Sequence, residues 1–327
     1  MKKILLRILA VLVVIIAGLL IFIFVAWNKK HNAPYPAITA STDSVIIARG
    51  KYLVFGPAHC ASCHVPMDKH TEVDKGVEVP LSGGWELTIP PGTFRARNLT
   101  PDMETGIGKL TDAEVARVMR YSVGHDGRSI FPFMPFQEMS DEDLTAIISF
   151  LRSQKPVKNP IKPTEYSFLG KVVMAFGLIK PVAPKNTPPK SVATDSTILS
   201  GSYLANSIAN CAGCHTKRDL KTGKFTGPVF AGGFQMLPDE FTKGYSFVTP
   251  NLTPDPETGL ITNWSESVFV KRFQSGRIQK TSPMPWESFS KMTEMDLKAV
   301  YRYLQSLKPV HNKIEKTVFT PDEKLPD

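Results

Sequence analysis

Two stretches of the sequence place two cysteines and a histidine at the same close spacing. They are Cys60, Cys63 and His64 in the first stretch, and Cys211, Cys214 and His215 in the second. Thiols one helical turn apart can add to the two vinyl groups on one edge of a porphyrin, and the adjacent imidazole then lies under the iron. Cys-x-x-Cys-His is the attachment signature of a c-type haem, so the sequence predicts two covalently bound c haems.

Other uses of a Cys-x-x-Cys pair remain as alternatives. Such pairs also hold zinc or act as thiol–disulfide redox centres. In a secreted protein they could form two short disulfides, and the chain has only these four cysteines. The histidine that directly follows each pair has no role in a disulfide and favours haem attachment.

Methionine commonly occupies the second axial position of such a haem and raises its reduction potential. Met134 and Met284 each precede a proline and lie about 70 residues after the histidine of their own half. Met139 and Met292 also recur, but they directly precede a predicted helix, where a hydrophobic residue can pack as a staple. We therefore expect His64 with Met134, and His215 with Met284, to be the iron ligands.

The rest of the sequence is an internal repeat. Gly-Gly at 83–84 recurs at 232–233, and Asn-Leu-Thr-Pro-Asp at 98–102 recurs at 251–255. The second copy follows the first by 151 residues at the first cysteine, 153 at the asparagine and 150 at the methionine of Met-Pro. A nearly constant offset across many landmarks indicates two homologous domains.

Helical patterns surround each motif. An apolar pattern runs from Asp43 into the first motif, and a similar one runs from Ile198 into the second. Thr111 begins a capping box that predicts a helix, while Ser140 and Thr293 each precede a closing helix with an apolar face. These stripes predict an all-α fold in which helices pack around each haem.

The N-terminal segment reads as a membrane anchor. Ile8 to Trp27 is twenty residues without a charge, enough to span a hydrocarbon core about 30 Å thick. No clear cleavage site follows, and Trp27 with Lys29-Lys30 resembles an interfacial anchor. We expect an uncleaved single-pass helix, with a cleaved signal peptide as the alternative.

Net charge gives no case for nucleic-acid binding. The chain carries +9, but residues 1–30 hold five basic residues and no acid, which leaves 34 basic and 30 acidic residues, or +4, in the remainder. Four haem propionates would bring that remainder close to neutrality, and no basic patch for a polyanion is expected.

The sequence thus predicts five parts. They are a membrane anchor at 1–30, a first domain at 43–157, a proline-rich linker at 158–194, a second domain at 195–312 and a polar tail at 313–327. Within the linker, residues 168–178 are apolar enough for a short helix packed across a domain.

The order of helix, Cys-x-x-Cys-His, long loop, helix, Met loop and closing helix resembles class I cytochrome c. Asn-Leu-Thr-Pro-Asp with Met-Pro and the closing-helix pattern is similar to the cytochrome subunits of membrane-bound alcohol and gluconate dehydrogenases, over about residues 43–312. The resemblance implies two tandem class I domains that accept electrons from a flavin or quinoprotein subunit and pass them to quinone or a terminal oxidase. The best-known members carry three haem domains, whereas this sequence has two motifs.

Electron transfer without substrate chemistry is the leading interpretation. A methionine candidate in each domain argues against a dihaem peroxidase, which needs an open axial position. A haem c subunit of a haem-copper oxygen reductase shares the layout and stays an alternative for the pathway. Because c haem is attached on the outer side of the bacterial inner membrane, we expect the bulk of the chain in the periplasm. Its expected partners are membrane lipid and redox proteins: a dehydrogenase subunit, an oxidase or a small cytochrome.

Overall fold

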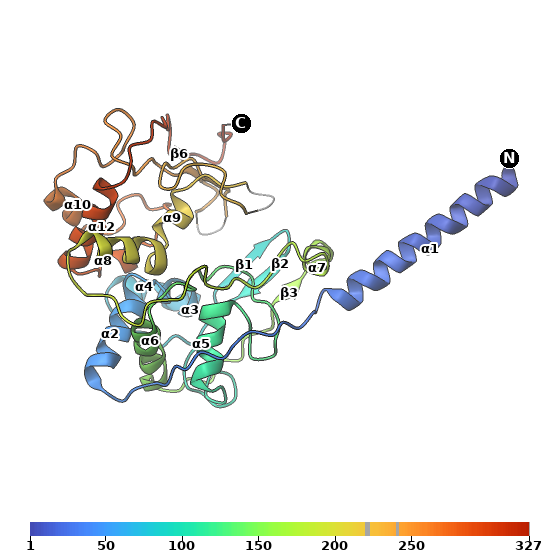
Figure 1. Cartoon of the computed structure of the whole chain (residues 1–327), viewed down its shortest axis with the longest axis horizontal. Helices are drawn as coiled ribbons and strands as arrows, with labels where there is room; N and C mark the ends of the chain where they lie inside the picture. Colours follow the sequence, from blue (N-terminus) through green and yellow to red (C-terminus); the bar gives the residue numbers. More distant parts are fainter. Residues whose placement is uncertain (220–222, 240–241, 327) are drawn as a thin grey trace.

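A single long helix, α1 (Lys2–Ala26), projects from the body of the protein (Figure 1). The computed structural model describes residues 1–219, 223–239 and 242–326. Within these ranges α1 is the one helix long and apolar enough to cross a membrane. Ile23 is its only buried residue, so the predicted anchor presents its apolar side chains outward.

The first domain follows the predicted order. Its elements are α2 (Ser44–Phe55), α3 (Ala61–His64), the 3-10 helix η1 (Met67–Lys69), α4 (His70–Asp74), β1 (Glu86–Ile89), β2 (Gly92–Arg95), α5 (Asp112–Tyr121) and α6 (Asp141–Ser153). The linker adds β3 (Glu165–Tyr166) and α7 (Phe168–Ala175).

The second domain has the same main elements in the same order, with a short extra helix, α11 (Trp286–Phe289), before its closing helix. Its elements are α8 (Ile198–Tyr203), the π-helical turn η2 (Leu204–Ile208), α9 (Cys211–Cys214), β4 (Gln235–Met236), β5 (Ser246–Val248), α10 (Glu266–Gln274), α11 (Trp286–Phe289), α12 (Glu294–Gln305) and β6 (Val318–Phe319). The predicted helix into the second motif is therefore present, with its last turn widened to a π-helix.

The predicted caps begin the helices as expected. The Thr111 hydroxyl accepts from the Glu114 amide, and the Glu114 carboxylate accepts from the Thr111 amide, which completes the capping box of α5. Ser140 and Thr293 accept from the amides three residues on and so begin α6 and α12. Each hydroxyl satisfies an otherwise free N–H of the first turn.

In each domain the first helix crosses the closing helix at a glycine. A Cβ at Gly50 of α2 would lie 1.8 Å from the carbonyl oxygen of Ala146 in α6. A Cβ at Gly201 of α8 would lie 1.9 Å from the carbonyl oxygen of Ala299 in α12. Only glycine permits this close approach, and the two crossings fix how each motif emerges from its first helix.

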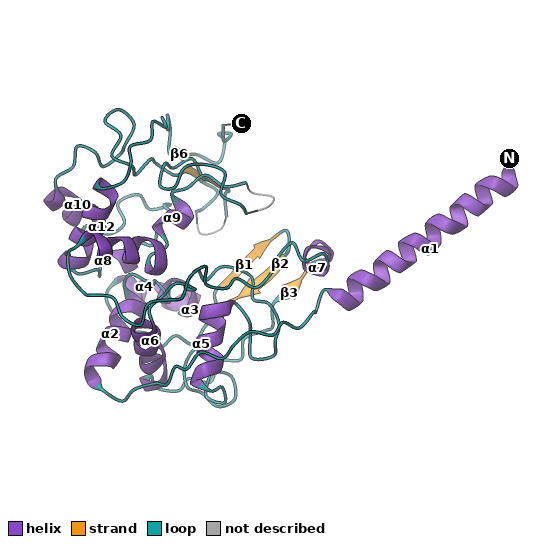
Figure 2. Cartoon of the chain, viewed as in Figure 1, coloured by secondary structure: helices purple, strands orange, loops and turns teal. Residues whose placement is uncertain are grey.

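Two small antiparallel sheets correct the all-α expectation (Figure 2). β1 pairs with β2 through a two-residue turn at Pro90-Pro91, with Ile89 opposite Gly92. The β-branched Thr88 and Ile89 precede this turn, and Thr93 and Phe94 follow it; such residues favour an extended hairpin over a helix. β4 and β5 also pair antiparallel in the second domain, with Met236 opposite Phe247.

The third strand of each sheet comes from beyond the expected domain ends. β3 of the linker pairs with β2, and β6 of the C-terminal tail pairs with β5. The two sheets are thus completed by short strands that follow residues 157 and 312 at equivalent places. The linker helix α7 also differs from expectation, since it packs against the anchor α1.

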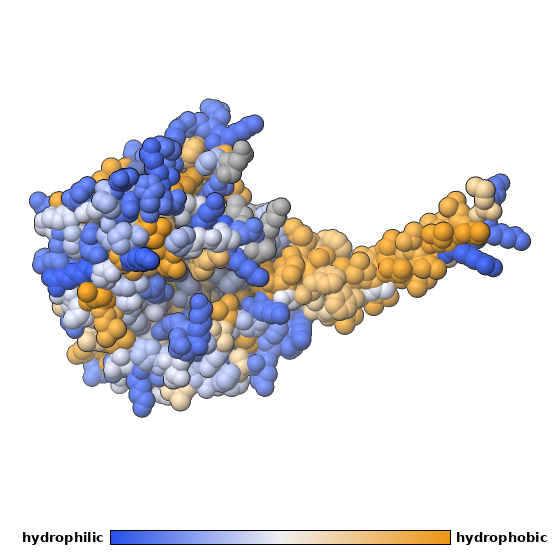
Figure 3. Space-filling view, turned by 45° about the horizontal axis from the view of Figure 1, so that its top comes forward, coloured by the Kyte–Doolittle hydropathy of each residue, from blue (hydrophilic) through white to orange (hydrophobic). Residues whose placement is uncertain are grey.

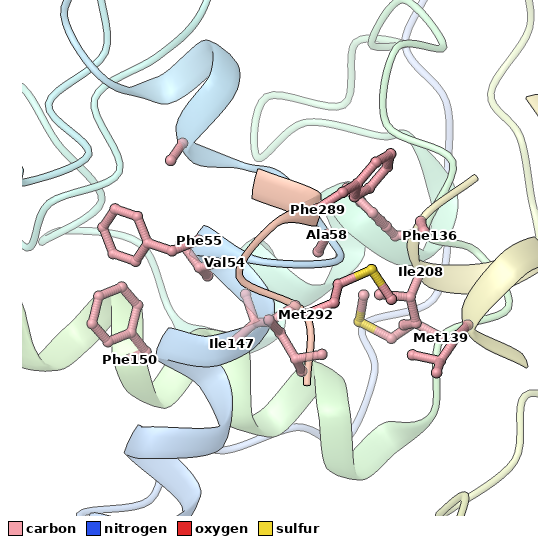
Figure 4. Packing of buried hydrophobic residues seen from close by; sticks show 14 of the residues in the cluster. Val54, Phe55, Ala58, Phe136, Met139, Ile147, Phe150, Ile208, Phe289 and Met292 are labelled. Carbon is pink, nitrogen blue, oxygen red and sulfur yellow. The ribbon is translucent and has the colours of Figure 1, made fainter. Parts of the chain in front are cut away.

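One hydrophobic cluster runs through both domains. It includes Met139 with no exposed surface from the first domain and Met292 at 5% exposure from the second, together with Phe136 and Phe289 (Figure 4). The two halves are thus joined by an apolar interface, and each closing helix begins at its edge.

Candidate haem-attachment sites

Each cysteine pair lies on one short turn of helix that begins after a left-handed residue. His59 has φ of 42° and Asn210 has φ of 52°, and each immediately precedes its first cysteine. The His64 amide donates to the Cys60 carbonyl at 2.9 Å, and the His215 amide donates to the Cys211 carbonyl at 2.8 Å. The two thiols and the imidazole of each motif therefore share one helical turn.

Each histidine is oriented by a backbone carbonyl. The Nδ1 atom of His64 lies 2.8 Å from the carbonyl oxygen of Arg97, and Nδ1 of His215 lies 3.2 Å from that of Pro250. A proton on Nδ1 leaves a lone pair on Nε2, and this is the tautomer that can bind iron through Nε2. Such a partner also raises the basicity of the imidazole toward a metal.

The Asn-Leu-Thr segments hold these carbonyls in place. The buried Asn98, next to Arg97, donates to the carbonyl oxygen of Val157 at 2.8 Å and accepts from the Thr100 amide at 2.9 Å. Asn251 makes the equivalent bonds in the second domain, to the carbonyl of Val310 and from the amide of Thr253. The repeat landmark thus ties the histidine's partner to the chain after the closing helix.

The Gly-Gly segments contact the other side of each histidine. The amides of Gly83 and Gly232 donate to the carbonyl oxygens of His64 and His215, each at 2.8 Å. Both glycines have positive φ, at 77° and 73°. A Cβ at Gly83 would lie 2.7 Å from the carbonyl oxygen of Ala96, so glycine is required there. The sequence showed these glycines as repeat markers, while their role in positioning depends on backbone geometry.

Burial controls the charge of the motif side chains. It raises the pKa of the Cys60 thiol to about 12 and that of Cys63 to about 11, so both are neutral thiols at pH 7. Burial also lowers the pKa of His64 and His215, although the carbonyl partner of each opposes this. Neutral imidazoles are the form that binds a metal.

The methionines fall into two classes. Met134 and Met284 are partly buried at the border of the core, in the loops that precede the closing helices. Met139 and Met292 lie inside the interdomain cluster. The structure therefore separates the two pairs by burial, and iron ligation by Met134 and Met284 stays a prediction.

The two sites differ in their surroundings. The guanidinium of Arg218 lies beside the second motif, where it donates to the Gly213 carbonyl and sits over the rings of Phe225 and Phe234 at 4.8 and 4.9 Å. In the first domain Met67 holds the corresponding position. The second site therefore has a partly buried cation that the first lacks.

The donor set suits a haem better than the alternatives. No disulfide joins any two of the four cysteines. Among the described residues no group of three or more His, Cys, Asp or Glu side chains could hold a metal ion. Each of the two motifs has a pair of thiols and one oriented imidazole. This set fits thioether attachment of one haem and a single histidine ligand to its iron.

Comparison with known proteins agrees with this chemistry. The cytochrome c family profile matches the chain twice, over residues 47–155 and 200–308. The chain belongs to the cytochrome c family. It has two cytochrome c domains and carries two c-type haems.

The chain is similar to cytochrome subunits of dehydrogenases. It is 31% identical over 293 residues to the cytochrome c subunit of an alcohol dehydrogenase (quinone) from Gluconacetobacter polyoxogenes, covering 84% of this chain and 58% of the relative. It is 27% identical to a fructose dehydrogenase cytochrome subunit from Gluconobacter japonicus, covering 87% and 57%.

Another relative is covered over most of its own length. A diheme cytochrome c-type protein from Cereibacter sphaeroides is 25% identical over 260 residues, covering 77% of this chain and 83% of the relative. By contrast, the chain spans only a little over half the length of the dehydrogenase subunits. These relatives are all described as cytochrome c proteins or cytochrome subunits.

Proposed function

We propose that this protein is a membrane-anchored dihaem cytochrome c. It carries electrons from a dehydrogenase or quinol-oxidising partner to a terminal oxidase or a small soluble carrier. The chain itself performs no substrate chemistry. The observation that carries the proposal is the duplicated pair of motifs, each with its histidine tied through Nδ1 to a backbone carbonyl.

The proposed residue roles extend this interpretation to each site. Cys60 and Cys63 in the first domain, and Cys211 and Cys214 in the second, are the thioether donors, and the adjacent histidines bind iron through Nε2. A bound haem supplies a one-electron couple between ferric and ferrous iron. Met134 and Met284 are the proposed thioether ligands, which favour ferrous iron because sulfur is a soft donor.

The anchor and the side of the membrane belong to the same proposal. α1 has 25 residues, so at 1.5 Å per residue it is about 37 Å long and can span a hydrocarbon core of about 30 Å. Trp27, Lys29 and Lys30 follow it and suit the interface. Since c haem is attached outside the bacterial inner membrane, the two domains belong in the periplasm.

The dehydrogenase partner is supported by the relatives. Those named as alcohol and fructose dehydrogenase subunits match most of this chain. The chain covers only part of their length, so a specific dehydrogenase does not follow.

A redox titration of the purified full chain tests the carrier function. We expect two electrons per chain in two one-electron steps, low-spin spectra in both oxidation states and no steady peroxide consumption. A high-spin haem with peroxide turnover would contradict a carrier and favour a peroxidase. Protease digestion of spheroplasts tests the topology, because residues 31–327 should be cleaved while the protein stays with washed membranes.

A further inference from the structure

The linker helix α7 packs against the base of the anchor. The rings of Phe22 in α1 and Phe176 at the end of α7 are 5.4 Å apart, and those of Trp27 and Tyr166 are 5.8 Å apart. The Lys171 ammonium of α7 lies 5.2 Å from the ring centre of Phe24. These contacts hold α7 beside the last turn of the helix proposed to cross the membrane.

The outer face of this segment is apolar and exposed. Phe168 is 54% exposed, Leu169 50%, Phe176 52% and Leu178 73%. From 168 to 178 the only charged residue is Lys171. Figure 3 shows the apolar surface of the anchor continuing onto the body of the protein at its base. A soluble surface gains nothing from such a patch, whereas a membrane interface would cover it.

A hollow of about 670 Å³ lies at the same place, between the chain after α1 and the end of α7. Its lining includes Trp27, Phe176, Lys29 and Lys180. None of the described residues that line the hollow carries a carboxylate. Apolar rings beside two lysines match a lipid, whose acyl chain is apolar and whose phosphate is anionic.

We propose that α7 and this hollow form a second contact with the bilayer. The face made by Phe168, Leu169, Phe176 and Leu178 lies in the interface, and the hollow takes the headgroup phosphate of an anionic phospholipid beside Lys29 and Lys180. The inference rests on the proposed anchoring by α1. Its consequence is that the first domain is held at a fixed orientation to the membrane.

Continuity with the anchor selects a bilayer as the occupant. α7 contacts the anchor at the level of Trp27, the level at which interfacial aromatic residues lie. A protein partner at this patch would have to displace lipid from the same depth.

Photo-crosslinking of the full chain in nanodiscs of phosphatidylcholine and phosphatidylglycerol tests the contact. p-Benzoylphenylalanine is placed separately at Phe24 in the anchor, at Leu169 in α7 and at Val45, an exposed apolar residue of α2. We expect phospholipid adducts at Phe24 and Leu169 with yields within about threefold of each other, as for two sites at membrane depth, and only background at Val45.

The outcomes separate the two proposals. Adducts at Phe24 without adducts at Leu169 would overturn the second contact and leave the anchor intact. Absence of adducts at Phe24 would overturn the anchoring itself. Adducts at Val45 equal to those at Leu169 would show unspecific capture and also overturn the inference.

The headgroup site has its own test. Native mass spectrometry compares retained phosphatidylglycerol in a Lys29→Gln/Lys180→Gln variant with a matched Lys75→Gln/Lys308→Gln variant at two exposed positions. We expect about a 30-fold weaker retention in the first variant only, since each lysine near an anionic surface contributes about 1 kcal/mol. Equal retention in both variants would overturn the headgroup site.

Discussion

The hydroxyl of Tyr52 in the first domain donates to a carboxylate oxygen of Asp296 in the second, 2.5 Å away. The equivalent bond runs in the opposite direction between the domains: the hydroxyl of Tyr203 in the second domain donates to Asp143 in the first, 2.8 Å away. Each tyrosine also accepts from the amide of the capping residue of the partner domain's closing helix, Thr293 or Ser140. We call these two sets of bonds the tyrosine latches.

The tyrosine latches should couple the two domains. Tyr52→Phe or Tyr203→Phe should each lower the free energy of unfolding by about 1–3 kcal/mol, because a buried carboxylate loses its donor. Thermal unfolding followed by circular dichroism checks this, with Tyr245→Phe as control. In the double variant we expect two resolved transitions where the native chain shows one. A single unshifted transition would mean that the apolar interface alone joins the domains.

The latches should also weaken at high pH. Burial and then the nearby carboxylate raise the pKa of Tyr52 above its usual value, and the same causes raise the pKa of Tyr203. A folded-state pKa above the unfolded value of about 10 gives stability that is complete below that pH and is lost as the pH rises through the folded value.

Melting temperatures between pH 8 and 12 check this expectation. The difference between the native chain and the Tyr52→Phe/Tyr203→Phe variant should be constant up to about pH 10 and then shrink. The charged groups facing Tyr52 are Asp296 and Arg49, and neither changes its usual charge in that window. A difference that persists unchanged to pH 12 would contradict the assignment.

The carbonyl that orients each histidine should tune one haem only. Asn98→Ala removes the bonds that hold the segment after Arg97, so we expect a weaker bond from His64 Nδ1, a less basic imidazole and a higher reduction potential in the first domain. Asn251→Ala is the matched variant for the second domain. A redox titration should show one step moved in each variant, and movement of both steps in either would indicate a global change.

The cation beside the second motif should affect the second haem. A positive charge near the iron stabilises the ferrous state, so Arg218→Gln should lower one of the two potentials. Arg302→Gln, which removes a cation paired with Glu266 on the surface, should leave both unchanged. Combining Arg218→Gln with Asn251→Ala assigns the step, because both changes should act on the same one. If they move different steps, the proposed electrostatic difference between the sites is wrong.

Features with local signals could be predicted from the sequence. Four helices begin where the sequence has a residue whose side chain caps the first turn. These residues are Asp43, Thr111, Ser140 and Thr293. The motifs and their repeat gave the two cytochrome c domains for the same reason, since residue type and spacing carry the chemistry.

Features that depend on distant pairing could not be predicted. The strands β3 and β6 are two residues long and exist only because β2 and β5 offer an edge. The partners of the histidines are backbone carbonyls, for which Arg97 and Pro250 give no side-chain signal. The tyrosine latches join residues that are 60 or more positions apart. In the sequence, Tyr52 looks like an ordinary apolar position of a helix.

Replacing the proposed axial methionines tests the site most directly. Met134→Ala and Met284→Ala should each remove about half of the weak near-infrared band of methionine-ligated ferric haem, because each thioether serves one of two irons. Covalent attachment should persist, since the cysteines and histidines are untouched. Met139→Leu and Met292→Leu are matched controls in the core; they should keep the full band and cost less than about 1.5 kcal/mol of stability. A full band in Met134→Ala or Met284→Ala, with loss in the corresponding control, would transfer the ligand to Met139 or Met292.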